Sequence, residues 1–142
     1  MKTMLPALLA ALVGLASCSK KDEAPQVAKG AGLEGRWQMV SDDRIDYTPT
    51  GTVASTISSL IPGANFSAEI TATLFTPYAG NMMGTPQPYT RSGMVVHLGS
   101  GTSPATYKTI TELTDHRLVW NSPVDGAFPS AYPSVYTTVY TR

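Results

Sequence analysis

The sequence predicts an all-β fold, either a small antiparallel barrel or a sandwich. Two observations lead to this prediction. Several stretches alternate apolar and polar residues with a period of two, which is the pattern of half-buried strands. The composition is rich in Thr, Ser, Tyr, Gly, Pro and Val, and only 14% of the residues are charged. This mixture suits sheets joined by tight turns better than it suits helices.

The first half of the folded region predicts short strands separated by turns. Residues 35–40 alternate and form one strand, and residues 45–47 form another after a bend at Asp42 and Asp43. Residues 52–61 are ambiguous, because their first half has a strand pattern and their second half has helical spacing. Residues 66–74 show the cleanest alternation and are predicted to form one strand.

The second half continues the pattern. Glycines and prolines break it at residues 77–88, which we expect to form a long loop, and alternation returns at residues 89–98. The remaining strands are predicted at residues 107–113, 117–120 and 135–142, with a loop at residues 121–134. The total is seven or eight strands and at most one short helix.

The N-terminus has the features of a secretory signal peptide. Lys2 precedes about a dozen mostly apolar residues, a run too short for a membrane span, which needs about 20. Small residues follow and lead to Cys18, the only cysteine. We therefore expect a signal peptide (residues 1–17), a flexible tether (residues 18–32) and one folded domain (residues 33–142).

Residues 15–18, Leu-Ala-Ser-Cys, resemble the lipobox of bacterial lipoproteins. This resemblance implies that Cys18 is acylated and that a lipid anchors the protein to a membrane. It further implies an outer-membrane lipoprotein on either the periplasmic or the surface-exposed face. The alternative is a secreted protein in which Cys18 lies near an ordinary cleavage site.

Three stretches of the folded region resemble the lipocalin-like lipoproteins of Bacteroidetes, within the calycin group of barrels. They are the Gly-x-Trp of residues 35–37, a hairpin at residues 110–120 and a closing strand at residues 135–142. The resemblance implies a small up-and-down β-barrel. It also implies a latch formed by Gly35, Trp37 and Arg142, with Arg117 as a poorer match for the cation. In the alternative, Trp37 is an ordinary core aromatic and Arg142 is solvated.

An eight-stranded barrel is either filled by its own side chains or holds one small ligand. For a barrel with a pocket, we expect a small hydrophobic ligand; otherwise the same residues form a packed core and the protein serves as a component of the cell envelope. The candidate cavity residues are Ile70, Leu74, Met94, Val96, Leu118 and Trp120.

A different class of function is a protein–protein interaction module, such as an inhibitor or an envelope assembly factor. Such a module would use the loops at residues 77–88 and 121–134. The pair Met82 and Met83 lies in the first loop, either as an adaptable lid or as exposed surface residues.

Catalysis, cofactors and nucleic-acid binding are not expected. The sequence contains no Gly-x-Ser-x-Gly elbow, and His97 and His116 are isolated from any metal-binding spacing. Asp42, Asp43 and Asp46 can hold a calcium ion, but an exposed bend needs none. Ten basic and ten acidic residues give a net charge of zero, so no basic surface for nucleic acid is indicated. The sequence therefore predicts a protein that is not an enzyme and has no metal or cofactor.

Overall fold

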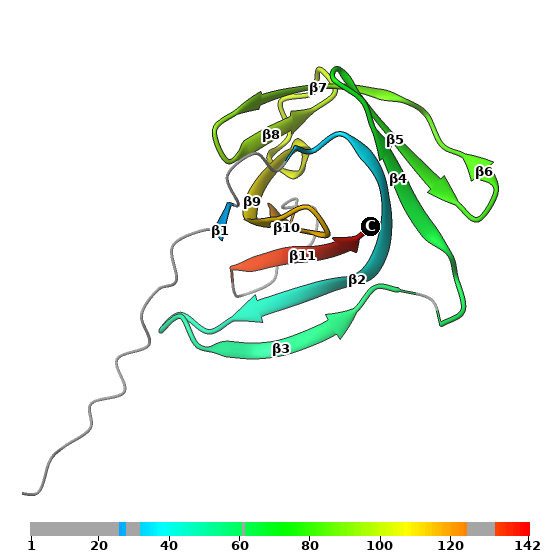
Figure 1. Cartoon of the computed structure of the whole chain (residues 1–142). Helices are drawn as coiled ribbons and strands as arrows, with labels where there is room; N and C mark the ends of the chain where they lie inside the picture. Colours follow the sequence, from blue (N-terminus) through cyan, green and yellow to red (C-terminus); the bar gives the residue numbers. More distant parts are fainter. Residues whose placement is uncertain (1–25, 28–31, 61, 125–132) are drawn as a thin grey trace, which may run out of the picture.

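A computed structural model describes residues 26–27, 32–60, 62–124 and 133–142. In these residues the chain forms a closed eight-stranded antiparallel β-barrel with extra strands, which confirms the predicted fold class (Figure 1). The predicted signal peptide, including its apolar run, and Cys18 lie outside the described residues. In the described part of the chain, no helix has the length and apolar character needed to cross a lipid bilayer.

Eight strands form the barrel itself. They are β2 (Gly35–Tyr47), β4 (Phe66–Ile70), β5 (Leu74–Ala79), β7 (Gln87–Ser92), β8 (Val95–Leu98), β9 (Tyr107–Leu113), β10 (Arg117–Pro123) and β11 (Ser134–Thr141). Each pairs with the next one along the chain, and β11 pairs with β2 to close the ring. Closure removes the free edges that an open sheet would expose.

Three short strands and one helical turn lie outside this ring. They are β1 (Gln26–Val27), parallel to β9; β3 (Val53–Ser58), beside β2; β6 (Met82–Met83), beside β5; and the 3-10 turn η1 (Pro104–Thr106), which precedes β9. Residues 53–58 are therefore a strand, which resolves the ambiguity between strand and helix there. The expected loop at residues 77–88 is in part a hairpin of β5 and β6.

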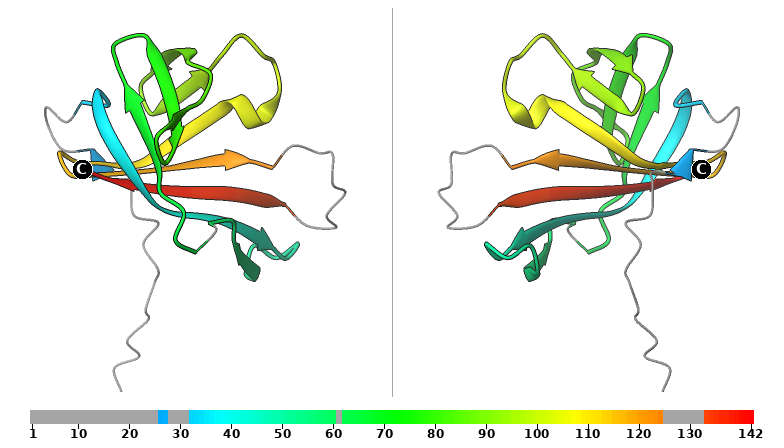
Figure 2. Two further views of the ribbon diagram at one scale, coloured as in Figure 1. Left: turned by 90° about the vertical axis from the view of Figure 1, so that its right-hand side faces the viewer. Right: turned by 90° about the vertical axis from the view of Figure 1, so that its left-hand side faces the viewer.

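The barrel has two different ends. Figure 2 shows β1 and the C-terminus at one end, and β3 and the turn before β9 towards the other. We call the first the closed end, because Trp37 lies there and is fully buried. The second, where η1 lies and where β2 ends, is the open end.

The bend expected at Asp42 and Asp43 is absent, and residues 35–47 form one strand. A shift in the pairing of β2 with β11 at Val139 instead marks a bulge, which curves the strand without ending it. The acidic residues find partners within the sheet. Thr138 Oγ1 donates to Asp42 Oδ1 at 2.7 Å, and Ser55 Oγ donates to Asp46 Oδ2 at 2.8 Å.

The two longest predicted strands are both hairpins. Residues 66–74 turn at Thr71, whose hydroxyl accepts from the backbone N–H of Leu74 at 3.1 Å, and residues 89–98 turn at Gly93 with a φ of 59°. Across the first turn, the alternation of inward and outward side chains shifts by one residue. Phe75 therefore points into the barrel, and Leu74 is 39% exposed.

The hydrophobic core fills the closed end and the middle of the barrel. It consists of Leu33, Trp37, Ala68, Ile70, Phe75, Val96, Leu98, Ile110, Leu113, Leu118, Trp120 and Tyr140. Each large side chain buried in this way contributes about 1.5–3 kcal/mol of hydrophobic stabilisation. Without a disulfide in the described residues, this core holds the strands in place.

Candidate functional site

The closed end is sealed around Trp37. Its indole Nε1 donates a hydrogen bond of 2.7 Å to the carbonyl of Leu33. The guanidinium carbon of Arg142 lies 4.1 Å from the centre of the indole ring, close enough for a cation–π contact. Gly35 lies directly beside this pair: a Cβ at that position would come within 2.8 Å of Arg142 Nη1. The structure thus brings together Gly35, Trp37 and Arg142.

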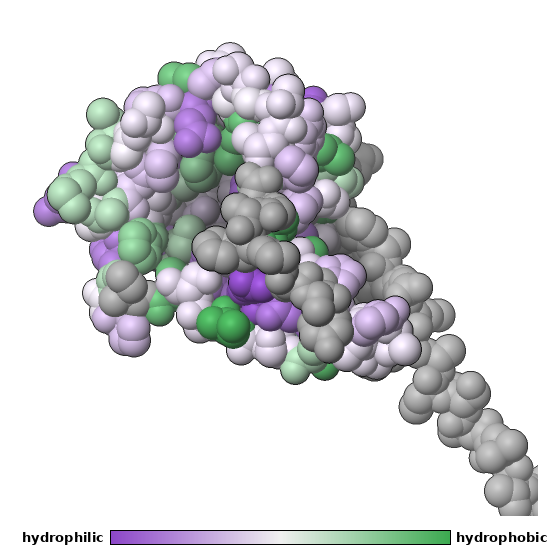
Figure 3. Space-filling model, turned by 180° about the vertical axis from the view of Figure 1, so that it is seen from behind, coloured by the Kyte–Doolittle hydropathy of each residue, from purple (hydrophilic) through white to green (hydrophobic). Residues whose placement is uncertain are grey.

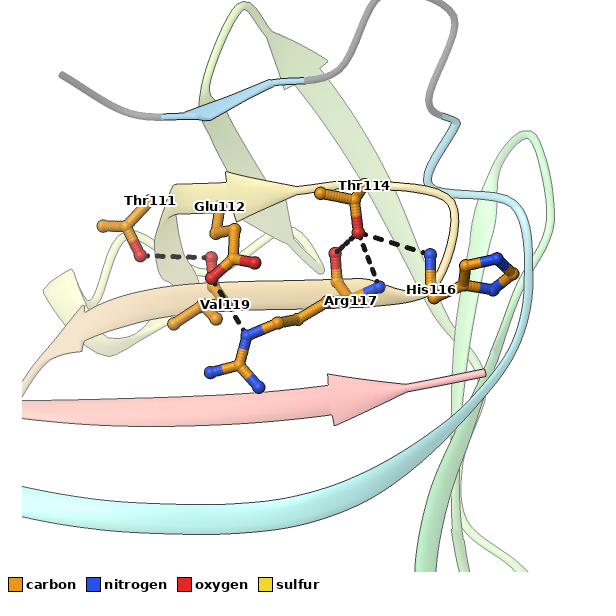
Figure 4. Close-up of polar contacts among 6 residues, drawn as sticks. All are labelled: Thr111, Glu112, Thr114, His116, Arg117 and Val119. Carbon is orange, nitrogen blue, oxygen red and sulfur yellow. Dashed lines mark hydrogen bonds and ion pairs between the residues drawn. The ribbon is translucent and has the colours of Figure 1, made fainter. Parts of the chain in front are cut away.

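Arg117 has a different environment from Arg142. Figure 4 shows that it lies in the β9–β10 hairpin, where its Nε is 2.9 Å from Glu112 Oε2. The hydroxyl of Thr114 accepts from the backbone N–H groups of His116 and Arg117 and so shapes the turn. Arg117 is therefore paired on the outside of this hairpin, and the contact with Trp37 belongs to Arg142.

A cavity of about 590 Å³ lies on the other side of the core, towards the open end. Its lining comes from β2, β5, β7, β8, β9, β10, β11 and η1. The lining residues are Met39, Phe75, Pro77, Gln87, Leu98, Ser103, Ala105, Thr106, Lys108, Trp120, Thr138 and Tyr140. Figure 3 views the molecule from this end and shows hydrophobic and hydrophilic residues interspersed on its surface.

Three aromatic rings form the apolar wall of the cavity. The Trp120 ring centre lies 5.6 Å from that of Phe75 and 5.3 Å from that of Tyr140, with the second pair edge-to-face. Such aromatic contacts fix ring positions as well as adding stability. The wall is therefore preformed by the core rather than assembled around a ligand.

The barrel wall is weakly paired beside the cavity. β5 and β7 share only two residue pairs, Leu74 with Pro88 and Phe75 with Gln87. Beyond them β5 pairs with β6 instead, and Pro77 accepts a hydrogen bond from Gly84 N–H at 2.8 Å. Pro77 and Gln87 both line the cavity, so the cavity lies next to the point where the two strands separate.

Lys108 is the one charged residue among those that line the cavity. It is in phase with the buried Ile110 on β9, and therefore points inward. Burial lowers the pKa of its ammonium group, and attraction from Asp42 offsets this only in part. Burial also raises the pKa of the neighbouring Tyr140 hydroxyl, and the Asp42 carboxylate raises it further.

A second group of polar side chains surrounds Asp46 near the end of β2. Asp46 accepts hydrogen bonds from Ser134 and Ser55 and is paired with Arg44 Nε at 2.9 Å. The bonds from Ser134, Ser55 and Arg44, in that order, lower the pKa of the Asp46 carboxyl. Because the Asp46 carboxylate oxygens already accept hydrogen bonds from these neighbours, the group stabilises the sheet and is not a binding site.

The observed lining differs from the residues expected from the sequence. Of the six candidates, only Trp120 lines the cavity. Ile70, Val96 and Leu118 are buried in the core, Met94 packs against that core, and Leu74 is on the outer face. Alternation identifies which side chains point inward but not at which height of the barrel the interior is filled.

Lys108 is the charged lining residue that was not among those predicted from the sequence. The sequence did indicate its inward position, because a lysine in phase with Ile110 on an alternating strand faces the same side as that buried residue.

His97 and His116 remain apart from any site: His97 stacks on Tyr107, with the ring centres 4.4 Å apart, and His116 lies in the β9–β10 turn. Within the described residues, no three His, Cys, Asp or Glu side chains are grouped so as to hold a metal ion.

A smaller hollow of about 300 Å³ lies outside the barrel beside the β5–β6 hairpin. Its lining is Phe66, Pro77, Tyr78, Ala79, Met82, Met83 and Gly84. Met82 and Met83 are 73% and 63% exposed. They belong to the hairpin and line this outer hollow rather than the barrel cavity.

No protein-family model, curated protein or solved structure matches this chain. The closed antiparallel barrel is compatible with a lipocalin-like fold. A fold alone does not determine function, so the residues of the cavity are the features that bear on it.

Proposed function

We propose that this protein is a lipid-anchored, extracytoplasmic lipocalin-like protein that binds a small hydrophobic molecule inside its barrel. The observation that carries the proposal is the cavity of about 590 Å³ walled by Phe75, Trp120 and Tyr140. Small-molecule sites commonly have volumes of about 300–1,000 Å³ and a mostly apolar lining with a few polar groups. The cavity fits this description.

The surrounding fold supports a binding role. A closed ring of strands holds the aromatic wall in place, so little conformational entropy is lost when a ligand enters. β5 and β7 are joined by only two residue pairs, so few hydrogen bonds would have to break for the barrel wall to open beside Pro77 and Gln87. A ligand can therefore be exchanged without opening the ring at its better-paired strands. The proposed role is non-catalytic and needs no cofactor.

The anchoring part of the proposal rests on the N-terminal sequence alone. Leu15, Ala16 and Ser17 before Cys18 are the residues on which the lipoprotein resemblance depends. A lipid on Cys18 would place the binding protein at the cell envelope, in the outer membrane. Two or more acyl chains are enough to hold a protein stably on a bilayer.

Native mass spectrometry of the purified protein tests the binding proposal. We expect a retained apolar molecule, and loss of that molecule in Ala105→Phe, which fills the cavity from η1. Ala54→Phe is the matched control, because Ala54 is exposed on β3 and does not line the cavity. A protein that binds no apolar molecule, either as purified or on addition of decanol, would contradict the proposal.

A second candidate function is a protein–protein interaction through the β5–β6 hairpin. The specific observation in its favour is the exposure of Met82 and Met83 beside the smaller hollow, since flexible methionines suit adaptable contact surfaces. Replacing both by serine should abolish capture of a partner and leave decanol binding in the barrel unchanged. This outcome would separate the two functions.

A further inference from the structure

The cavity contains a cation that the fold leaves unpaired. Among the residues that the structure describes, none forms an ion pair or hydrogen bond with the Lys108 ammonium. It projects from β9 opposite Val96 and two residues before Ile110, both of which are fully buried apolar side chains. An ammonium group in such a wall is costly unless something compensates its charge.

The acidic side chain whose charge acts on Lys108, Asp42, does not supply this compensation. Asp42 attracts Lys108 but is not in ion-pair contact with it, and Asp42 Oδ1 accepts the hydroxyl of Thr138 at 2.7 Å. The Tyr140 hydroxyl likewise forms no hydrogen bond within the described part of the chain. Two polar groups that line the same cavity, one positive and one a neutral donor, are thus available to a ligand.

A purely apolar ligand would be poorly matched to this lining. It would bury the Lys108 ammonium away from solvent and put nothing polar beside it, which costs free energy. An anionic group on the ligand would instead give the ammonium a charge-assisted hydrogen bond. The apolar part of the same ligand would then lie against Phe75 and Trp120.

We infer that the ligand is a small amphipathic anion, such as a fatty acid, whose carboxylate pairs with Lys108 while its hydrocarbon part lies against the aromatic wall. This inference rests on the proposed binding function and specifies the chemical class of the ligand. Tyr140 is placed to donate a second hydrogen bond to the same head group, because it lines the cavity and no described residue accepts from its hydroxyl. Selectivity for the charge of the head group then resides in Lys108, the one charged residue among the described residues that line the cavity.

Decanoate and decanol test the inference, because they share a hydrocarbon chain and differ in charge. Isothermal titration at neutral pH should show that the protein binds decanoate about tenfold or more tightly than decanol, the factor typical of one hydrogen bond to a charged group. Lys108→Gln should remove this preference by weakening decanoate binding, and it should bind decanol at least as tightly as the unaltered protein does, because no ammonium is then buried under the ligand. Lys108→Arg should keep the preference in part, since it keeps the charge.

Two further variants sharpen the test. Asp42→Asn removes the neighbouring negative charge while keeping an oxygen that accepts from Thr138, so it should strengthen decanoate binding severalfold and leave decanol unchanged. Arg117→Gln, which removes a cation that is ion-paired outside the cavity, should leave the preference unchanged. Circular dichroism confirms that each variant is folded.

The outcomes separate the two proposals. Equal affinity for decanoate and decanol, or a preference that survives Lys108→Gln, would overturn the anionic ligand and leave the binding function standing. Failure of the folded protein to bind either compound would overturn the binding function itself, and the inference with it.

Discussion

The guanidinium of Arg142 stacks on the indole of Trp37, with its central carbon 4.1 Å from the ring centre. It also donates hydrogen bonds to the backbone carbonyls of Glu34 and Asp115. One side chain therefore joins the segment that enters β2, the β9–β10 turn and the end of β11. These segments are distant in sequence, and together they seal the closed end of the barrel.

Arg142→Ala should lower the free energy of unfolding by about 2 kcal/mol, because it removes a cation–π contact and hydrogen bonds from a charged donor. Urea unfolding followed by circular dichroism measures this loss. Arg91→Ala, at an exposed arginine on β7 that bonds only the local Gly93 carbonyl, should change stability by less than about 0.5 kcal/mol. Equal effects of the two substitutions would show that Arg142 has no special role.

Gly35→Ala should destabilise the protein by about 1–3 kcal/mol for two separable reasons. The φ of Gly35 is 130°, which strains any residue with a Cβ, and the new Cβ would crowd Arg142 Nη1. In an Arg142→Ala background only the backbone strain remains, so the loss should be smaller, and the double-mutant cycle measures the difference. Gly51→Ala, with a φ of 81° and open space around it, gives the strain alone. Additive losses in the cycle would rule out the crowding.

Trp37→Ala should cost about 3–5 kcal/mol, as for other fully buried large side chains. Trp37→Phe keeps much of the buried volume but loses the hydrogen bond to the carbonyl of Leu33, so we expect a smaller loss than for alanine. Thermal and urea unfolding measure both. A change of only a degree or two in melting temperature for Trp37→Ala would show that this end of the barrel is not sealed by the indole.

Tyr140 should make the protein sensitive to alkaline pH. Its pKa is raised above the usual value of about 10 by burial, so the folded protein keeps this proton where the unfolded chain has lost it. The stabilisation is fully present below pH 10 and is lost as the pH rises above it. Tyr140→Phe should make the fall in unfolding free energy above pH 10 shallower, with Tyr78 and Tyr89, whose pKa values are also raised, supplying the remainder. An unchanged slope would contradict the burial of this hydroxyl.

Cys18→Ser should release the protein from membranes, because an acyl chain cannot be attached without the thiol. Detergent partitioning of the full chain measures this, and mass spectrometry of the unaltered protein should show the added mass of the acyl groups. The matched control is Ser19→Ala, which leaves the thiol in place. Unchanged membrane partitioning of Cys18→Ser would contradict the lipid anchor.

The sequence predicted the fold class well because a two-residue period survives in most strands. It predicted strand ends poorly where side chains rather than glycine or proline make the turn. Thr71 ends a strand with its hydroxyl, so residues 66–74 look continuous in sequence although the chain reverses there. At Asp42 and Asp43 the error was the opposite, a predicted break inside a continuous strand. Acidic residues are typical of a bend, but here Asp42 accepts a hydrogen bond from Thr138 and Asp43 is half-exposed within β2.

The cavity was harder to predict than the fold. Whether an inward side chain meets empty space depends on how the two ends of the barrel are filled, and this is a property of the whole ring. Trp37 and Leu118 fill the closed end, whereas Lys108 and Tyr140 lie where the interior is open. The inward position of Lys108 could have been predicted from the sequence, because it lies two residues before Ile110 on an alternating strand.

The pairing of β1 with β9 has a consequence for how a tethered barrel would be oriented. Gln26 pairs with Glu112 and Val27 with Leu113, beside the turn that Arg142 contacts. The stretch from Cys18 to Gln26 can reach at most about 28 Å when fully extended. On a chain held by lipid at Cys18, the sealed base would thus lie nearest the bilayer. The mouth would point into the aqueous phase, so cargo would be collected from solution or from other proteins rather than drawn directly out of the underlying leaflet.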